Sequence, residues 1–152
     1  MAKKDIKDLT KYLKSFPSDI KEKVLWLREF VWDLYPDANE LIYDNYNALA
    51  FGWSVTDKMG DIFCSVAVYR TGHNVHFGFL WGAKINDPKK ILLGKGNQYR
   101  YILVENEKKF PKAYMKKLIK EAHANALKSM KPVKQELKGM TITKSISARK
   151  RA

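Results

Sequence analysis

Cysteine is almost absent from this sequence, and long apolar runs are absent altogether. Cys64 is the only cysteine among 152 residues, so no disulfide can form within the chain. Its place in an apolar stretch indicates a small buried side chain rather than a nucleophile. No stretch approaches the roughly 18 uninterrupted apolar residues of a membrane span, and no apolar leader segment follows Met1. We therefore expect a soluble protein of the reducing cytoplasm.

Recognisable catalytic motifs are also lacking. The sequence contains no Ser/His/Asp order, no metalloprotease helix and no acid pair with a catalytic spacing. This is mild evidence against an enzyme, because catalytic groups converge in space and not in sequence. The histidines His73, His76 and His123 have no paired spacing that suits a metal. We predict no metal site, assign no cofactor and favour a binding protein over an enzyme.

Acidic residues are scarce in the C-terminal part of the chain. The formal net charge is +13, but residues 1–61 carry a net charge of −2 and residues 62–152 one of +15. This asymmetry favours a polyanionic partner, although charge also serves solubility. Residues 131–152 hold seven basic residues, the single acid Glu136 and little apolar periodicity. We predict one domain over residues 1–130 and a flexible basic tail over residues 131–152.

Apolar residues spaced by three and four predict three helices. The first covers residues 5–16, and the second follows Pro17, with Ser18 as its cap, and ends before Pro36. The third opens at Pro111 and buries Met115, Leu118, Ala122 and Ala126. Its outward lysines form a basic ridge, for which a solvated helix face is the simpler interpretation: Lys112, Lys116 and Lys120.

Aromatic and β-branched segments separated by turn residues predict strands over residues 48–55, 62–70 and 75–81. Short connections make these neighbours antiparallel, and a further strand is expected over residues 99–105. The predicted fold class is α+β, with an antiparallel sheet of about four to five strands. An N-terminal helix pair and a long C-terminal helix are expected to pack against this sheet.

The stretch LLGKGNQYRYILV, from Leu92 to Val104, has two glycines around Lys95 and could be taken for a phosphate-binding loop. Such a loop precedes a helix, whose free N–H groups then face the anion. Here the glycines follow a short helix predicted over residues 89–93, for which Gly94 is the expected C-terminal cap. The sequence therefore favours a turn leading into a strand, and Lys95 and Arg100 could hold an anion only through their side chains.

In order along the chain, these segments resemble the YdhG-like family of domains of unknown function. The resemblance rests on the N-terminal helix pair, YPDANELIYDNY from Tyr35, VHFGFLWG from Val75 and the glycine-lysine-glycine stretch. It covers about residues 5–127 and implies a compact α+β domain. Tyr101 stands where many relatives carry histidine. The family offers no established catalytic residues, but some members have been likened to frataxin as iron chaperones.

The second face of the predicted sheet, opposite the row of Phe77 and Phe79, is a candidate pocket wall beside the helices. A histidine, a glycine that leaves room at Gly78 and a permanently charged arginine suit an anionic group beside an apolar surface. The alternative is that His76 and Arg100 only satisfy Glu40 or backbone carbonyls in a structural network. The candidate ligand-binding residues are Glu40, Tyr43, Tyr46, His76, Lys95 and Arg100.

Three hypotheses for the function follow. The first is a non-catalytic binding module for a small anionic or aromatic ligand. The second is a frataxin-like iron chaperone, which would need clustered carboxylates from among Asp33, Asp37, Glu40 and Asp44. The third is a basic protein that binds nucleic acid weakly and without sequence preference through the lysine ridge and the tail. The sequence does not indicate an oligomeric state.

Overall fold

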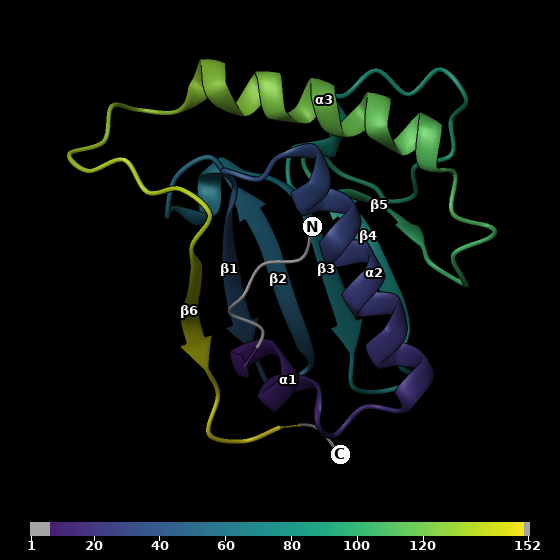
Figure 1. Cartoon of the computed structure of the whole chain (residues 1–152). Coiled ribbons are helices and arrows are strands. Elements are labelled where there is room, and N and C mark those ends of the chain that lie inside the picture. Colours follow the sequence, from purple (N-terminus) through teal and green to yellow (C-terminus); the bar gives the residue numbers. More distant parts are fainter. Residues whose placement is uncertain (1–6, 151–152) are drawn as a thin grey trace.

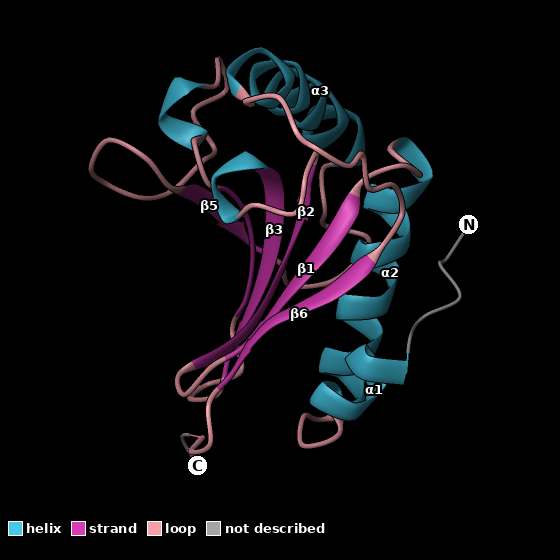
Figure 2. Ribbon diagram, turned by 90° about the vertical axis from the view of Figure 1, so that its left-hand side faces the viewer, coloured by secondary structure: helices cyan, strands magenta, loops and turns pink. Residues whose placement is uncertain are grey.

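A computed structural model describes residues 7–150 of the protein. It consists of one six-stranded sheet with helices on one face (Figures 1 and 2). The helices α1 and α2 lie along this face, and α3 crosses one end of the strands. The elements in chain order are α1 (Lys7–Leu13), α2 (Ser18–Leu34), β1 (Asn39–Asp44), β2 (Ala48–Ser54), η1 (Met59–Asp61), β3 (Ile62–Tyr69), β4 (Val75–Phe79), η2 (Gly82–Lys84), β5 (Arg100–Leu103), α3 (Lys112–Ser129) and β6 (Thr141–Ile146).

The sheet has the strand order β5-β4-β3-β2-β1-β6. The strands β1 to β5 are all antiparallel neighbours. The short connections predict this for β2, β3 and β4, whereas about 20 residues separate β4 from β5. The last strand, β6, pairs with β1 in parallel, so the sheet is mixed. The α+β class is confirmed, and the expected four to five antiparallel strands become six strands with one parallel edge.

The core lies between the sheet and the helices, where the predicted apolar stripes are buried. In α2 the side chains of Ile20, Val24, Leu27 and Val31 are at most 4% exposed. The helix begins at Ser18, but its N-cap is Pro17 and no side chain caps it, so the predicted capping role of Ser18 is wrong. Within residues 7–150, none of the helices is both long enough and apolar enough to cross a membrane.

The segment predicted as a flexible tail instead supplies β6, so the expectation of a tail without structure is wrong for residues 141–146. The segment needs little apolar surface of its own, because its backbone pairs with the exposed edge of β1. Asn39 fixes the entry to the strand: its side chain accepts a hydrogen bond from the N–H of Met140 at 3.0 Å and donates one to the carbonyl of Leu137 at 2.9 Å.

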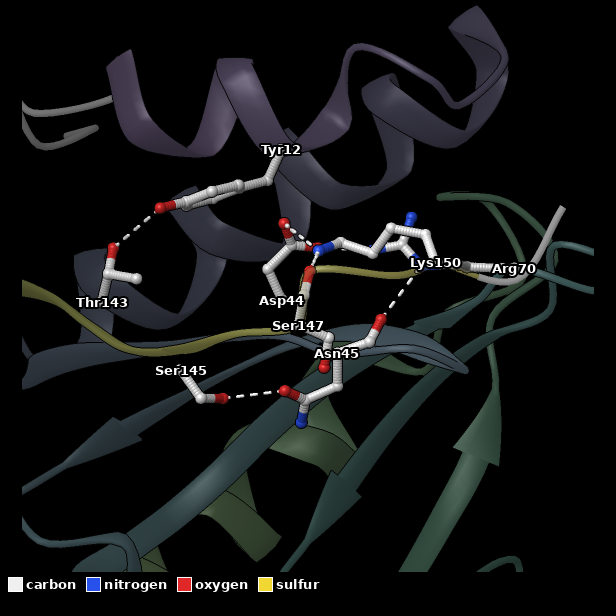
Figure 3. A network of polar contacts seen from close by, with 8 residues as sticks. All are labelled: Tyr12, Asp44, Asn45, Arg70, Thr143, Ser145, Ser147 and Lys150. Atoms are coloured by element: carbon white, nitrogen blue, oxygen red, sulfur yellow. Dashed lines mark hydrogen bonds and ion pairs between the residues drawn. The ribbon is translucent and has the colours of Figure 1, made fainter.

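Side chains from both ends of the chain hold β6 in place (Figure 3). The hydroxyl groups of Tyr12 in α1 and Thr143 lie 3.2 Å apart, and Ser145 donates to the side chain of Asn45 at 2.8 Å. Asp44 forms an ion pair with Arg70 and lies 3.5 Å from the Lys150 ammonium. The basic end of the chain is therefore docked against part of its acidic half.

The short helix predicted over residues 89–93 does not form. The Asp87 carboxylate accepts a hydrogen bond from the N–H of Leu92 at 2.9 Å and another from the hydroxyl of Tyr114. Lys90 adopts a positive φ of 54°, which breaks helical geometry. Because the carboxylate of Asp87 organises these residues into a loop, Gly94 is not a helix cap.

The glycine-lysine-glycine stretch forms a turn and not an anion cradle. Gly94 and Gly96 adopt φ values of 122° and 89°, which favour glycine. The Arg100 guanidinium donates to the carbonyls of Gly96 and Tyr99, at 2.8 Å each, and to that of Lys95 at 3.4 Å. The loop therefore directs its carbonyl oxygens at the Arg100 guanidinium. A phosphate-binding loop has the opposite polarity, because it directs backbone N–H groups at an anion.

A buried ion pair joins α2 and β1 and is bound in addition by β6, which is distant in the sequence. Arg28 of α2 donates two hydrogen bonds to the Glu40 carboxylate of β1, at 2.8 and 3.0 Å, and both residues are at most 1% exposed. Thr141 of β6 donates to the same carboxylate at 3.1 Å. Burial raises the pKa of the Glu40 carboxyl, whereas the bonds from Arg28 and Thr141 act in the opposite direction.

We expect Glu40→Ala to lower the free energy of unfolding by about 3–5 kcal/mol, because it leaves the Arg28 guanidinium buried without its counter-ion. Replacing both partners, as Arg28→Met with Glu40→Leu, removes both buried charges and should recover most of the loss. Urea denaturation of Glu40→Ala and of the double variant, each compared with the wild type, measures these changes in unfolding free energy. A loss below about 0.5 kcal/mol for Glu40→Ala would contradict the importance assigned to the pair.

Truncation after Met130 should destabilise the domain. The shortened chain loses the backbone bonds between β1 and β6 and the hydroxyl group that Thr141 gives to Glu40. We expect the melting temperature to fall by several degrees, which corresponds to about 2–4 kcal/mol. Removal of residues 148–152 alone is the control: it keeps β6 and loses the partly exposed Lys150 contact with Asp44, so it should cost no more than about 1 kcal/mol. Equal stability of the full and truncated chains would show that β6 contributes nothing.

Candidate ligand-binding pocket

A cavity of about 460 Å³ lies where the sheet meets the second half of α3. Three parts of the chain form its walls: the η1 turn with the start of β3, the end of β4 with the η2 turn, and one stripe of α3 with the segment after its end. The lining residues are Lys58, Gly60, Asp61, Ile62, Phe63, Phe79, Trp81, Lys84, Ile85, Ala122, Asn125, Ala126, Ser129 and Lys131.

Antiparallel pairing explains why these segments meet. The hairpin between β3 and β4 lies at one end of these strands, so the start of β3 and the end of β4 lie together at the other. The η1 turn precedes β3 and the η2 turn follows β4 within a few residues, and both therefore lie at this end. Helix α3 packs across the same end (Figure 1), and its second half forms one wall of the cavity.

The inner wall of the pocket is apolar. Phe79 of β4 and Phe63 of β3 are buried, and Ala122 and Ala126 present the small side chains of the buried α3 stripe. The small size of these alanines leaves space between the helix and the sheet that larger side chains would fill. The wall therefore suits an aliphatic or aromatic group.

A hydrogen bond between the two turns forms part of the mouth. The indole Nε1 of Trp81 donates to the carbonyl of Gly60 at 2.9 Å, although the Trp81 side chain is 36% exposed. The Lys84 ammonium lies 5.3 Å from the centroid of the same indole ring, within the range of a cation–π contact. The mouth thus combines an ordered aromatic ring with a positive charge.

Three lysines surround the mouth of the pocket. Lys58, Lys84 and Lys131 are exposed, and none forms an ion pair with any residue between 7 and 150. The single acid of the lining, Asp61, accepts a hydrogen bond from the hydroxyl of Thr56 at 2.7 Å. The electrostatic field at the mouth therefore favours an anion.

The residues that sequence reasoning selected are not brought together. Glu40 is paired with Arg28, and Arg100 binds carbonyls of its own loop, in agreement with the structural alternative for this arginine. The side chain of Lys95 is exposed in that loop, and Tyr46 lies in the exposed turn between β1 and β2. None of these four residues lines the pocket.

Tyr43 and His76 do share the sheet face opposite the helices. Ala50 and Ala67 separate them on the strands between, and His76 stacks on Tyr101 at 4.2 Å between ring centroids. The Tyr43 hydroxyl and the His76 Nδ1 are buried and have no hydrogen-bond partner within residues 7–150. His76 therefore belongs to an aromatic cluster with Tyr101 and with Tyr69, whose ring centroid lies 4.8 Å from that of the imidazole.

The space expected beside Gly78 is filled by Tyr99. A Cβ atom on Gly78 would lie 2.3 Å from the Tyr99 hydroxyl oxygen and 2.6 Å from its ring. The glycine therefore allows a tyrosine of the chain itself to cross the strand, and burial raises the pKa of this tyrosine. This packing leaves no room for a ligand directly above Gly78.

The sequence did contain a signal for the observed pocket. From the sequence alone, the residues from Thr56 to Asp61 indicate a turn between two strands, and Trp81 ends the strand predicted over residues 75–81. Since β3 and β4 form a hairpin, the segments on its outer side had to lie at the same end of the sheet. That topology alone could have placed Lys58 beside Trp81.

Two of the four acidic residues proposed as iron ligands are held in ion pairs. Glu40 and Asp44 each belong to a buried ion pair, with Arg28 and Arg70. Within residues 7–150, the structure contains no group of three or more His, Cys, Asp and Glu side chains that could hold a metal ion. No observation in this part of the chain favours the iron chaperone.

Comparisons with known proteins identify no relative of this chain. No family model matches the chain, and neither the curated proteins nor the solved structures contain a match. The resemblance to the YdhG-like family therefore stays a prediction, and the function is argued from the pocket itself.

His123 supports the pocket wall from behind. Its imidazole stacks on Tyr35 at 3.9 Å and meets the ring of Phe63 edge-on at 4.9 Å between centroids. Burial lowers the pKa of His123 below its ordinary value of 6.5, because the charged imidazolium loses hydration. The neutral imidazole thus links α3 to the Phe63 side of the cavity.

Acidification should destabilise the protein through His123. Its pKa is lower in the folded than in the unfolded chain, so its contribution is fully present above about pH 6.5 and is lost as pH falls through the folded-state pKa. His123→Phe keeps an aromatic ring and should reduce the fall in unfolding free energy between about pH 7.5 and pH 5. The pH dependence that remains in His123→Phe includes a contribution from His76, because burial lowers the pKa of this histidine as well. Identical slopes for both proteins would exclude this role.

Proposed function

We propose that the protein is a non-catalytic binding module for a small anionic or aromatic ligand, which it holds in the pocket between β3, β4 and α3. The observation that carries this proposal is a cavity that combines an apolar wall with three lysines that form no ion pair in the described part of the chain. The cavity volume lies within the roughly 300–1,000 Å³ of ordinary small-molecule sites.

The lining chemistry favours binding over catalysis. Histidine is absent from the lining residues that the structure describes, and Cys64 is fully buried, with a thiol pKa that burial raises well above its ordinary value. The Ser129 hydroxyl donates to the carbonyl of Ala126 at 3.4 Å and has no histidine beside it in the lining. A nucleophile with an adjacent base, which covalent catalysis requires, is therefore missing among these groups.

A thermal-shift screen of small aromatic acids should reveal ligands that raise the melting temperature by mass action. Asn125→Trp places an indole in the cavity and should abolish the shift. Ala124→Trp introduces the same indole at an exposed neighbouring position outside the lining, so it is the matched control and should keep the shift. Hits that stabilise both variants equally would place the ligand elsewhere and contradict the proposal.

A second candidate function rests on the outer face of α3. Lys112, Lys116 and Lys120 are exposed, as the sequence predicts, and Lys117 and Lys128 add to the same helix. Within residues 7–150 only Lys112 among the five has an ion pair, with Glu107 at 2.7 Å. A lysine-rich surface of this kind binds phosphates without reading bases. This supports weak nucleic-acid association.

Binding to a fluorescent oligonucleotide should weaken steeply with salt. Each neutralised phosphate contributes about 0.7–0.9 to the slope of log affinity against log salt concentration. Changing Lys112, Lys116 and Lys120 to Gln should therefore reduce the slope by about two to three. The same changes at Lys14, Lys90 and Lys144, exposed lysines outside α3, are the control. Sequence-selective, salt-resistant binding would contradict this candidate.

A further inference from the structure

Polarity is distributed by depth in the pocket. The buried lining side chains of Ile62, Phe63, Phe79 and Ile85 are all apolar, whereas Lys58, Lys84 and Lys131 are all exposed. A lysine at the rim of an apolar surface commonly packs its aliphatic stem there and keeps its ammonium in water. The cationic groups therefore lie at the mouth and not at the bottom.

An anion at the bottom of this pocket would lose its hydration without a replacement. The buried apolar side chains cannot donate a hydrogen bond, and a buried charge without partners is strongly disfavoured. The Asp61 carboxylate, fixed by its bond from Thr56, would also repel a second anion drawn inward. The only cationic side chains of the lining that can meet an anion are the exposed lysines.

From this arrangement we infer that the ligand is an amphiphilic monoanion, with an apolar body that enters the pocket first and an acidic group that stays at the mouth. This inference rests on the proposed binding function and specifies the ligand class of the same site. The apolar body lies against the rings of Phe63 and Phe79, and the acidic group lies beside Lys84, where the indole of Trp81 positions the ammonium.

The two ends of such a ligand contribute to affinity in different ways. The buried body should provide most of the affinity, which should rise about fourfold for each methylene group that enters the cavity. The acidic group faces exposed lysines in water, so its pairing with any one of them should change affinity by only about two- to fivefold. That part of the affinity, unlike the apolar part, should weaken with added salt.

Calorimetric titrations with 2-naphthoate, decanoate, 2-naphthol, benzoate and inorganic phosphate test this order. We expect 2-naphthoate and decanoate to bind, benzoate to bind at least about tenfold more weakly than 2-naphthoate because its apolar body is smaller, and phosphate not to bind. The neutral 2-naphthol should bind a few-fold more weakly than 2-naphthoate. All binding should be lost in Asn125→Trp and kept in Ala124→Trp.

Lys84→Gln separates the contribution of the charge from that of the cavity. It should weaken 2-naphthoate by about two- to fivefold and leave 2-naphthol unchanged. Lys128→Gln removes an equal charge from an exposed position outside the lining and should change neither.

Three results would overturn the inference, and they can be told apart. Binding of phosphate or benzoate as tight as that of 2-naphthoate, lost in Asn125→Trp, would leave the pocket as a ligand site but reject the amphiphile. Equal binding of 2-naphthoate and 2-naphthol, unaffected by Lys84→Gln, would also reject the amphiphilic anion while leaving the pocket as a ligand site. No binding by any probe, with wild type and Asn125→Trp alike, would count against the amphiphile and against the proposed function together.

Discussion

The ion pair between Arg28 and Glu40 is the contact on which the arrangement of the chain depends. A carboxylate and a guanidinium taken out of water each need a full set of partners. The Glu40 carboxylate obtains them from α2, through Arg28, and from β6, through Thr141. The guanidinium lies 4.5 Å from the ring centroid of Trp32, which packs against Trp53 of β2. The buried Glu40 carboxylate therefore fixes both α2 and β6 against β1.

The uneven distribution of charge along the chain leads to ion pairs at the β1–β6 edge of the sheet but not at the pocket beside α3. Around β1 and β6 the basic C-terminal segment meets acids of the first half, as Lys150 does at Asp44. At the pocket, Lys58, Lys84 and Lys131 form no ion pair with the acids of residues 7–150. Folding thus pairs some of the basic residues with acids and leaves these three lysines, among others, exposed at the pocket, where an anionic partner can approach.

The sequence predicts what periodicity controls and misses what a distant partner decides. The buried stripe of α2 and the strands near residues 48–55, 62–70 and 75–81 follow from apolar spacing. Residues 141–146 contain four β-branched side chains, which are typical of a strand, but only the available edge of β1 decides that they pair there. Interactions formed in the folded chain also explain why the predicted ligand-binding residues do not form the site. Arg100 and Glu40 are chemically suitable for a ligand, but Arg100 is engaged by nearby carbonyls and Glu40 by Arg28, a partner in another element.

The C-terminal segment connects the pocket to the ion pair. It leaves α3 at Ser129, contributes Lys131 to the mouth, and reaches β6 at Thr141, whose hydroxyl binds Glu40. An extended chain covers about 3.3–3.6 Å per residue. Asn39 holds Leu137 and Met140, so only the few residues between Lys131 and Leu137 can adjust the span. The partners of β1 therefore limit the reach of Lys131, and the fit of the mouth depends on the same contacts that stabilise the opposite edge of the sheet.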